Sequence, residues 1–246
     1  MSTIRGARER ARIEVTAAIK EEARKQLARE GAAKLSLRAV ARELGMVSSA
    51  LYRYFPSRDD LLTALIVDAY DAVGAAAESA VAAVPDRGDP LVRWGALCSA
   101  VRGWALAHPH EYALIYGSPV PGYQAPQDTV GPASRVGLAL ISIVRDAHRA
   151  AGIALPPLTP RLRPEAERLS ADLAPDLPPA VAVALVAAWS EIFGLISFEI
   201  FGQFHRIVED REAFFAHATD RLAHEVGLRP RHAVGGGATL TPAGGS

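Results

Sequence analysis

Apolar residues recur at helical spacing along almost the whole chain, and no stretch alternates as a half-buried strand would. Gly and Pro interrupt the apolar stripes at places where they end or open helices. The pattern therefore predicts an all-α protein. The expected helices span residues 8–30, 37–44, 48–55, 57–83, 90–107, 109–117, 131–151, 179–204 and 209–227, with at most a short helix at 164–173.

The stretch from 36 to 62 is the most informative one. Ser36 is a good N-cap for a short helix, and Gly45 ends that helix because glycine enters the left-handed conformation without steric cost. In the next short helix, Leu51 and Phe55 lie four residues apart and can pack inward. This arrangement predicts a helix-turn-helix, whose second helix fits the DNA major groove. Its outward positions are Ser49, Ala50, Arg53 and Tyr54.

This stretch resembles the TetR family of transcriptional regulators. The resemblance covers about residues 15–65 and is carried most specifically by Leu-Tyr-Arg-Tyr-Phe at 51–55 with Arg58 after it. Two weaker matches, HPHEYALIYGSPVPGY at 108–123 and AWSEIFGLISFEIFG at 188–202, resemble the ligand domain of one subgroup. The resemblance implies a ligand-responsive, homodimeric DNA-binding protein, most often a repressor. It implies a DNA-binding domain at 1–60 and a helical ligand-binding and dimerisation domain at 61–228.

The resemblance also assigns DNA contacts residue by residue. We expect Arg53 to make a bidentate contact to guanine, although it is also compatible with a solvated surface charge. Sealing the small core is the alternative role for the two tyrosines. The matching positions are Tyr52, Tyr54 and Arg58 for phosphate, Ser48, Ser49, Ala50 and Arg53 for base edges, and Ser36 and Arg38 for the DNA backbone.

Charge is unevenly distributed although the net charge is zero. Residues 1–60 hold 13 Lys or Arg against 8 Asp or Glu, whereas residues 61–246 hold 14 against 19. A basic N-terminal unit is the electrostatic mark of a protein that meets a polyanion at one end. The first residues add a basic arm, which either reaches a neighbouring groove or is a free end: Arg5, Arg8, Arg10 and Arg12.

The stretch from 180 to 204 is apolar nearly all round, which is typical of a helix buried on several sides. It is either a central core helix or a subunit interface. Ser190, Gly194 and Gly202 form a strip of small residues that another backbone could approach. The resemblance favours the interface, because the family dimerises through its last two long helices as a four-helix bundle. We therefore expect a homodimer through residues 179–227.

Aromatic side chains of the C-terminal part are candidates for an effector pocket, with His110 and tyrosine hydroxyls as its polar groups. For any single aromatic residue, an ordinary core position is the favoured interpretation, and it is the set as a whole that favours a pocket. No charged cluster lies among them, so we expect a neutral, hydrophobic effector. The candidates are Trp94, Trp104, His110, Tyr112, Tyr116, Trp189 and Phe193.

Other classes of function find little support. Cys98 is the one cysteine, so no disulfide framework is expected, and no phosphate-binding Gly-rich loop or nucleophile motif is present. His108 and His110 lack a third metal ligand. We therefore expect no cofactor and no enzyme, no membrane span, and a cytoplasmic location with a disordered tail at 229–246. The alternative is a helical protein that binds small molecules or partner proteins and no longer binds DNA.

Overall fold

The computed structural model describes residues 2–85, 89–150 and 153–230. Within these ranges every regular element is a helix, which confirms the predicted all-α class. Short 3-10 turns at Ala32–Lys34, Gln127–Thr129 and Pro160–Leu162 join some of the α-helices. The α-helices are α1 (Ser2–Glu30), α2 (Leu37–Glu43), α3 (Ser48–Leu51), α4 (Arg58–Ala83), α5 (Pro90–Ala107), α6 (Pro109–Tyr116), α7 (Val130–Ala150), α8 (Arg163–Leu173), α9 (Pro179–Ile200) and α10 (Arg211–Val226).

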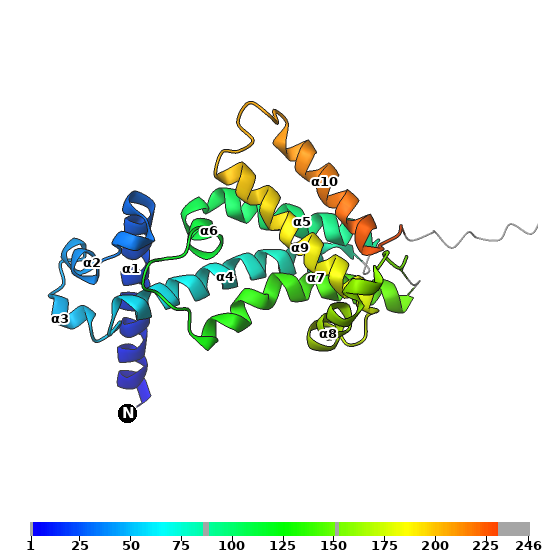
Figure 1. Cartoon of the computed structure of the whole chain (residues 1–246). Helices are drawn as coiled ribbons and strands as arrows, with labels where there is room; N and C mark the ends of the chain where they lie inside the picture. The colour runs from blue at the N-terminus through cyan, green and yellow to red at the C-terminus, as the bar shows by residue number, and fades with distance from the viewer. Residues whose placement is uncertain (1, 86–88, 151–152, 231–246) are drawn as a thin grey trace, which may run out of the picture.

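The smaller of two hydrophobic cores lies at one end of the molecule, where α1, α2, α3 and the first turns of α4 meet (Figure 1). We call this part the head. The apolar stripe of α1 packs on the inward faces of the two short helices, as the helical spacing predicted. The fully or nearly fully buried side chains of this core include Ile19, Ala23, Leu27, Leu37, Val40, Leu51, Phe55, Leu61, Leu62 and Leu65.

Helix α4 belongs to both cores. Its side chains up to Leu65 pack in the head, and those from Ala69 onward pack in the larger core. Ser57 caps it by accepting a hydrogen bond from the Asp60 backbone N–H, and Asp59 adds a second acidic group in the first turn. The change from one core to the other thus falls inside a continuous helix, a little beyond the predicted boundary at residue 60.

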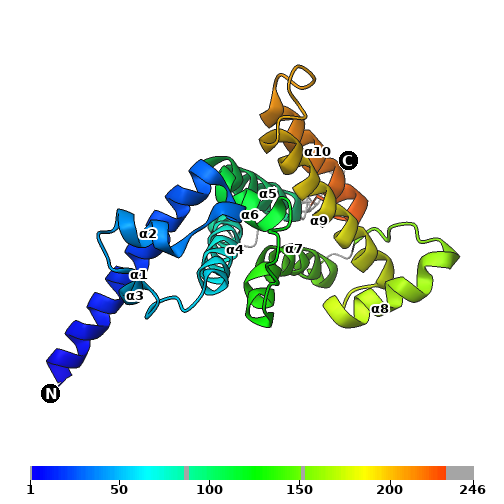
Figure 2. The same cartoon turned by 60° about the vertical axis from the view of Figure 1, so that its left-hand side comes forward.

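The larger core is built by the rest of α4 with α5, α7, α9 and α10. Helix α6 contacts α1, α4, α5 and α9, so it lies between the two cores, and α8 packs on α9 (Figure 2). Trp94 is fully buried at the centre, and its indole N–H donates to the Thr219 backbone carbonyl at 2.9 Å. This bond ties α5 to α10.

The structure differs from the sequence prediction at several helix ends, and α3 ends at Leu51 rather than at residue 55. Helix α1 begins at Ser2 rather than near residue 8. The N-cap of α3 is Val47, which offers no side-chain hydrogen bond. Helix α9 ends at Ile200 rather than at 204, because Gly202 takes a φ of 83° and the chain turns there. Of the predicted tail, residues 231–246 lie outside the described ranges.

Helix α9 is apolar on most sides, as predicted. By length and composition alone it would suffice to cross a bilayer, a criterion that core helices of other proteins also meet. One side of α9 is buried in the larger core, through Leu185, Ile192 and Ile196 among others. The other side is discussed below as a candidate subunit interface.

Candidate nucleic-acid interface

A tight turn presents α3 at the surface of the head. Gly45 adopts a φ of 65°, which only glycine tolerates well, and the Met46 N–H donates to the Ala41 carbonyl at 2.8 Å. Leu51 is fully buried and anchors the inner side of α3. The geometry is the helix-turn-helix that the sequence predicted, with α3 at the outer edge of the molecule (Figure 1).

The outer side of α3 carries donors and small side chains. Ser49, Tyr52 and Arg53 are exposed, and Ser48 and Ala50 lie at its margin, half-buried. Among the described residues, the Arg53 guanidinium has no hydrogen-bond or ion-pair partner, and the same holds for exposed Arg38 on α2. Two unpaired cations beside small polar groups suit a surface that meets phosphate and base edges.

Two of the predicted contact residues also have structural roles. Tyr54 is half-buried and packs its ring against the head core, so the interpretation of this tyrosine as a core seal is supported for its ring. Ser36 is the N-cap of α2 and accepts from the Ala39 N–H at 3.4 Å. The Ser36 N–H donates to the buried Gln26 side chain at 3.1 Å. The amide of Gln26 reaches the Lys34 carbonyl at 3.4 Å, a link that the sequence did not reveal.

Arg58 has hydrogen-bond partners within the head that the sequence did not reveal. Its Nε donates to the Leu35 carbonyl at 3.2 Å, and its Nη2 donates to the Ala32 carbonyl at 2.9 Å and the Ala33 carbonyl at 3.3 Å. Its Nη1 lies 3.4 Å from Asp59 Oδ1. The guanidinium therefore holds the connection between α1 and α2 in place. The phosphate contact expected of Arg58 stays a prediction.

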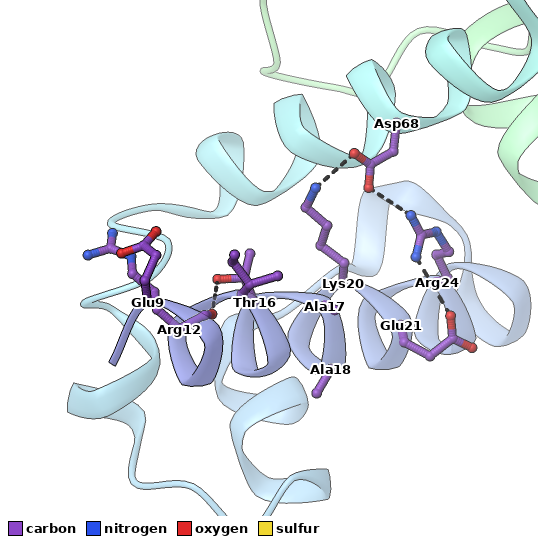
Figure 3. Close-up of a pocket in the computed structure, with 10 residues that line it drawn as sticks. Glu9, Arg12, Thr16, Ala17, Ala18, Lys20, Glu21, Arg24 and Asp68 are labelled. Carbon is purple, nitrogen blue, oxygen red and sulfur yellow. Dashed lines mark hydrogen bonds and ion pairs between the residues drawn. The ribbon is translucent and has the colours of Figure 1, made fainter. Parts of the chain in front are cut away.

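A network of charges joins the head to the larger domain, and sequence analysis did not find it. Asp68 of α4 accepts from Lys20 Nζ at 2.8 Å and from Arg24 Nη2 at 2.7 Å, both on α1 (Figure 3). Arg24 Nε also donates to Glu111 of α6 at 2.9 Å. The pairs are 44 to 87 residues apart in the chain, so no local pattern announces them.

An open pocket of about 610 Å³ lies beside this charge network (Figure 3). Its lining is mainly α1 with Asp68 of α4, and it includes Glu9, Lys20, Glu21 and Arg24. Such a charged lining does not suit the hydrophobic effector that we expected. A second pocket, of about 400 Å³, lies among α4, α5 and α7 and is lined by Glu78, Val81, Ala82, Val84, Arg93, Ala139 and Ser142. Neither pocket is lined by the predicted effector residues.

The structure does not gather all predicted effector residues at one place. Trp94 and Tyr112 are fully buried core residues, and the Tyr112 hydroxyl donates to the Phe193 carbonyl at 3.0 Å. Burial raises the pKa of Tyr112 to about 12. Trp104 stacks on His108 with ring centroids 5.3 Å apart, and His110 is exposed.

Three of the predicted residues do come together. The ring centroids of Tyr116 and Phe193 are 4.2 Å apart, and Trp189 meets Phe193 edge-on at 5.9 Å. Trp189 is 39% exposed, so this cluster reaches the surface. Burial raises the pKa of the Tyr116 phenol, whose hydroxyl has no hydrogen-bond partner among the described residues.

Metal or thiol chemistry has little support in the described part of the chain. No group of three or more His, Cys, Asp or Glu side chains is placed to hold a metal there. Cys98 is fully buried in α5, and this burial raises the pKa of its thiol. A buried thiol with a raised pKa is a poor nucleophile.

Two known domain families together match most of the chain. Residues 19–65 match the family described as bacterial regulatory proteins, tetR family. Residues 94–222 match the tetracyclin repressor-like C-terminal domain. The first match covers the helix-turn-helix and the second covers α5 to α10.

Known relatives and solved structures agree with these matches. The HTH-type transcriptional regulator Rv1816 of Mycobacterium tuberculosis is 44% identical over 211 residues, which cover 81% of this chain and 86% of that protein. The crystal structure of SCO4313, described as a candidate regulatory protein, is 34% identical with a TM-score of 0.70 and covers 88% of this chain and 98% of that one. The regulator PfmR from Thermus thermophilus shares the fold, with 19% identity, a TM-score of 0.53 and coverage of 84% and 97%.

Proposed function

The chain belongs to the TetR family of bacterial transcriptional regulators, and on that basis we propose that it is a repressor that binds a palindromic operator as a homodimer. A small hydrophobic effector releases it from the operator. Residues 1–60 bind DNA and residues 61–228 bind the effector and dimerise, with α4 shared between them. The protein acts in the cytoplasm, where its DNA is.

The observation that carries the DNA-binding role is the outward face of α3 with its unpaired arginine. We assign Arg53 to a guanine edge and Tyr52 to a phosphate. Arg38, at the start of α2, is a second phosphate contact. Ser36 offers the DNA backbone its hydroxyl, although this oxygen already caps α2. Ser48, Ser49 and Ala50 face base edges, and the Tyr54 hydroxyl reaches a phosphate while its ring stays on the core.

A binding assay with the DNA upstream of the protein's own gene tests this role. We expect a specific complex that tightens steeply as salt is lowered, because phosphate contacts release counterions. The alternative is a helical binding protein that no longer meets DNA. It would be favoured if neither this fragment nor random duplex bound at low salt.

Homodimerisation is supported by the outward side of α9 and the adjoining end of α10. Phe198 is 53% exposed, Phe201 is 44% exposed and Phe214 is 40% exposed, an apolar surface that water does not favour. A Cβ atom added at Gly194 would meet nothing within 4 Å, so a second helix has room to approach. A second copy presenting the same face would cover this surface, since two-fold contacts between identical patches are the common oligomer interface.

Gly194→Glu tests the dimer. The substitution would place an unpaired charge in the buried interface, and we expect a monomer in sedimentation at micromolar concentration. Gly137→Glu is the matched control, because Gly137 is also a helical glycine with open space around its Cα, but on α7. A monomeric wild-type protein would contradict the proposal.

We place the effector at the cluster of Tyr116, Phe193 and Trp189. Its rings offer stacking surfaces, and the free Tyr116 hydroxyl offers one polar group. Tyr116 is the last residue of α6, whose Leu114 packs against the head core and whose Glu111 pairs with Arg24. Movement of α6 would therefore reach the head directly. A tenfold release from the operator requires about 1.4 kcal/mol of differential affinity between the two states.

A compound screen by thermal shift, followed by operator binding with each hit, tests this site. We expect hydrophobic compounds that raise the melting temperature and weaken operator binding. Tyr116→Phe keeps the ring and removes the hydroxyl, so it should weaken hits that carry an acceptor without changing operator affinity in their absence. Hits that never alter operator affinity would contradict a regulatory role for the cluster.

A further inference from the structure

Helix α1 is longer than the head requires. It begins at Ser2, yet its first fully buried side chain is Ile19. Every residue from 6 to 14 is exposed, including Ile13 at 60%. The segment before Val15 extends about 20 Å at 1.5 Å per residue. In Figures 1 and 2, this free end extends past α3 along the head.

The core-facing stripe of α1 continues into the extension as a stripe of arginines. Ile19, Ala23 and Leu27 lie four residues apart and pack on the head core. Counted back by helical steps of three and four, the same side carries Arg12 and Arg8. In Figure 3, Arg12 projects from the side of α1 that also carries Lys20, which pairs with α4.

Arg10 belongs to the same extension but lies on a different side of the helix from Arg8 and Arg12. At about 100° per residue it lies roughly opposite Arg8 and Arg12 on the helix. All three arginines are exposed, and none has an ion-pair or hydrogen-bond partner for its side chain among the described residues. Glu14 lies roughly opposite Arg12 on the helix, whereas Glu9, three residues before Arg12, lies beside it in Figure 3.

We propose that the extension of α1 is a second DNA-contacting element, in which Arg8 and Arg12 bind phosphates that flank the bases read by α3. The proposal rests on the DNA-binding function given above. The stripe continues the side of α1 that packs on the head core, and the extension that carries it passes α3 in Figures 1 and 2. Free guanidinium groups complement the charge of the duplex backbone, and such contacts are independent of sequence. The partner is therefore the phosphate backbone rather than a base.

The test is the salt dependence of binding to a labelled 30-base-pair duplex of random sequence and to the upstream fragment. The logarithm of the binding constant falls with the logarithm of salt concentration by about 0.9 for each phosphate neutralised. Arg8→Gln and Arg12→Gln should each reduce that slope by about 1.8 for a dimer, because each copy loses one contact. Arg10→Gln is the matched control and should leave the slope unchanged.

The outcomes separate this proposal from the proposed function. If Arg8→Gln and Arg12→Gln keep the wild-type slope while the protein still binds DNA, the extension is a solvated helix and only this inference fails. If the wild-type protein binds neither duplex, the DNA-binding function itself fails. All three variants change exposed residues, so equal melting temperatures and helical circular dichroism would show that folding is not the cause of any difference.

Discussion

The head and the larger domain place their tyrosines in opposite ways. In the head, Tyr52 is 42% exposed and Tyr54 keeps only its ring on the core. In the larger domain, Tyr112 is fully buried and Tyr116 is largely enclosed, and burial raises the pKa of both phenols. Tyr52 of the head is therefore open to a partner, whereas Tyr112 of the larger domain serves packing. Substitutions of exposed residues in the head should therefore reduce DNA affinity, whereas substitutions of buried residues in the larger domain should reduce stability.

The largest expected effect is that of Trp94→Ala in the larger core. Truncating a fully buried tryptophan and removing its hydrogen bond to the Thr219 carbonyl should lower the free energy of unfolding by about 3–5 kcal/mol. Urea unfolding followed by circular dichroism measures it. Tyr52→Ala is the contrasting change and should alter stability by less than about 0.5 kcal/mol while weakening DNA binding. Equal stability losses in the two variants would remove the contrast between the two regions.

Arg53→Ala should produce the largest effect on base preference. Loss of a bidentate contact to guanine should cost about 1–3 kcal/mol of operator binding and relax the preferred sequence, with the melting temperature unchanged. Selection of binding sites from random DNA measures this preference. Arg29→Ala, an exposed arginine at the end of α1, is the control. An unaltered site profile for Arg53→Ala would show that another residue reads the base.

Tyr112→Phe should cost about 1 kcal/mol, because it removes a buried hydroxyl that contacts the Phe193 carbonyl and Ser197. The phenol has a pKa near 10 when unfolded and about 12 when folded, so the folded state holds this proton more tightly. The stabilisation by this group is therefore intact below pH 10 and is lost as pH rises from about 10 to about 12. Unfolding experiments across this range should show a smaller alkaline loss in the variant than in the wild type.

Asp68→Asn, at the joint between the regions, should have a small effect on stability. Its two ion pairs are partly exposed, so we expect a loss of less than about 1 kcal/mol, reduced further by salt. The same variant should change operator affinity more than Asp172→Asn, which breaks an exposed pair within α8. Equal operator affinities for the two variants would show that the joint does not position the head.

The local sequence pattern predicted those features of the fold that depend on residues close together in the chain, such as helix ends and the side of a helix that faces outward. Ser36 and Gly45 mark the ends of α2, and the spacing of Leu51 and Phe55 fixes which side of α3 faces out. The structural role of Arg58 was not predicted, because its acceptors are backbone carbonyls 23 to 26 residues earlier, which carry no signature in the sequence.

Features that depend on residues far apart in the chain could not be predicted from the sequence. They include the ion pairs to α1 and the burial of each aromatic residue in the larger domain. Asp68 and Glu111 join α1 across 44 and 87 residues, so their pairing becomes visible only once the helices are packed. The aromatic candidates were correctly placed in one domain, but sequence spacing could not separate the core residue Trp94 from the surface-reaching Trp189.

Helix α4 has a consequence for how the protein moves in solution. Because this one helix passes from the head core into the larger core, no flexible linker separates the two parts. Backbone amides of α2 and α3 should therefore relax in NMR with the rotational correlation time of the whole particle, rather than with the shorter time of a free head domain. A shift in the tilt of α4 would then appear at both heads of a dimer together, as a change in the distance between them.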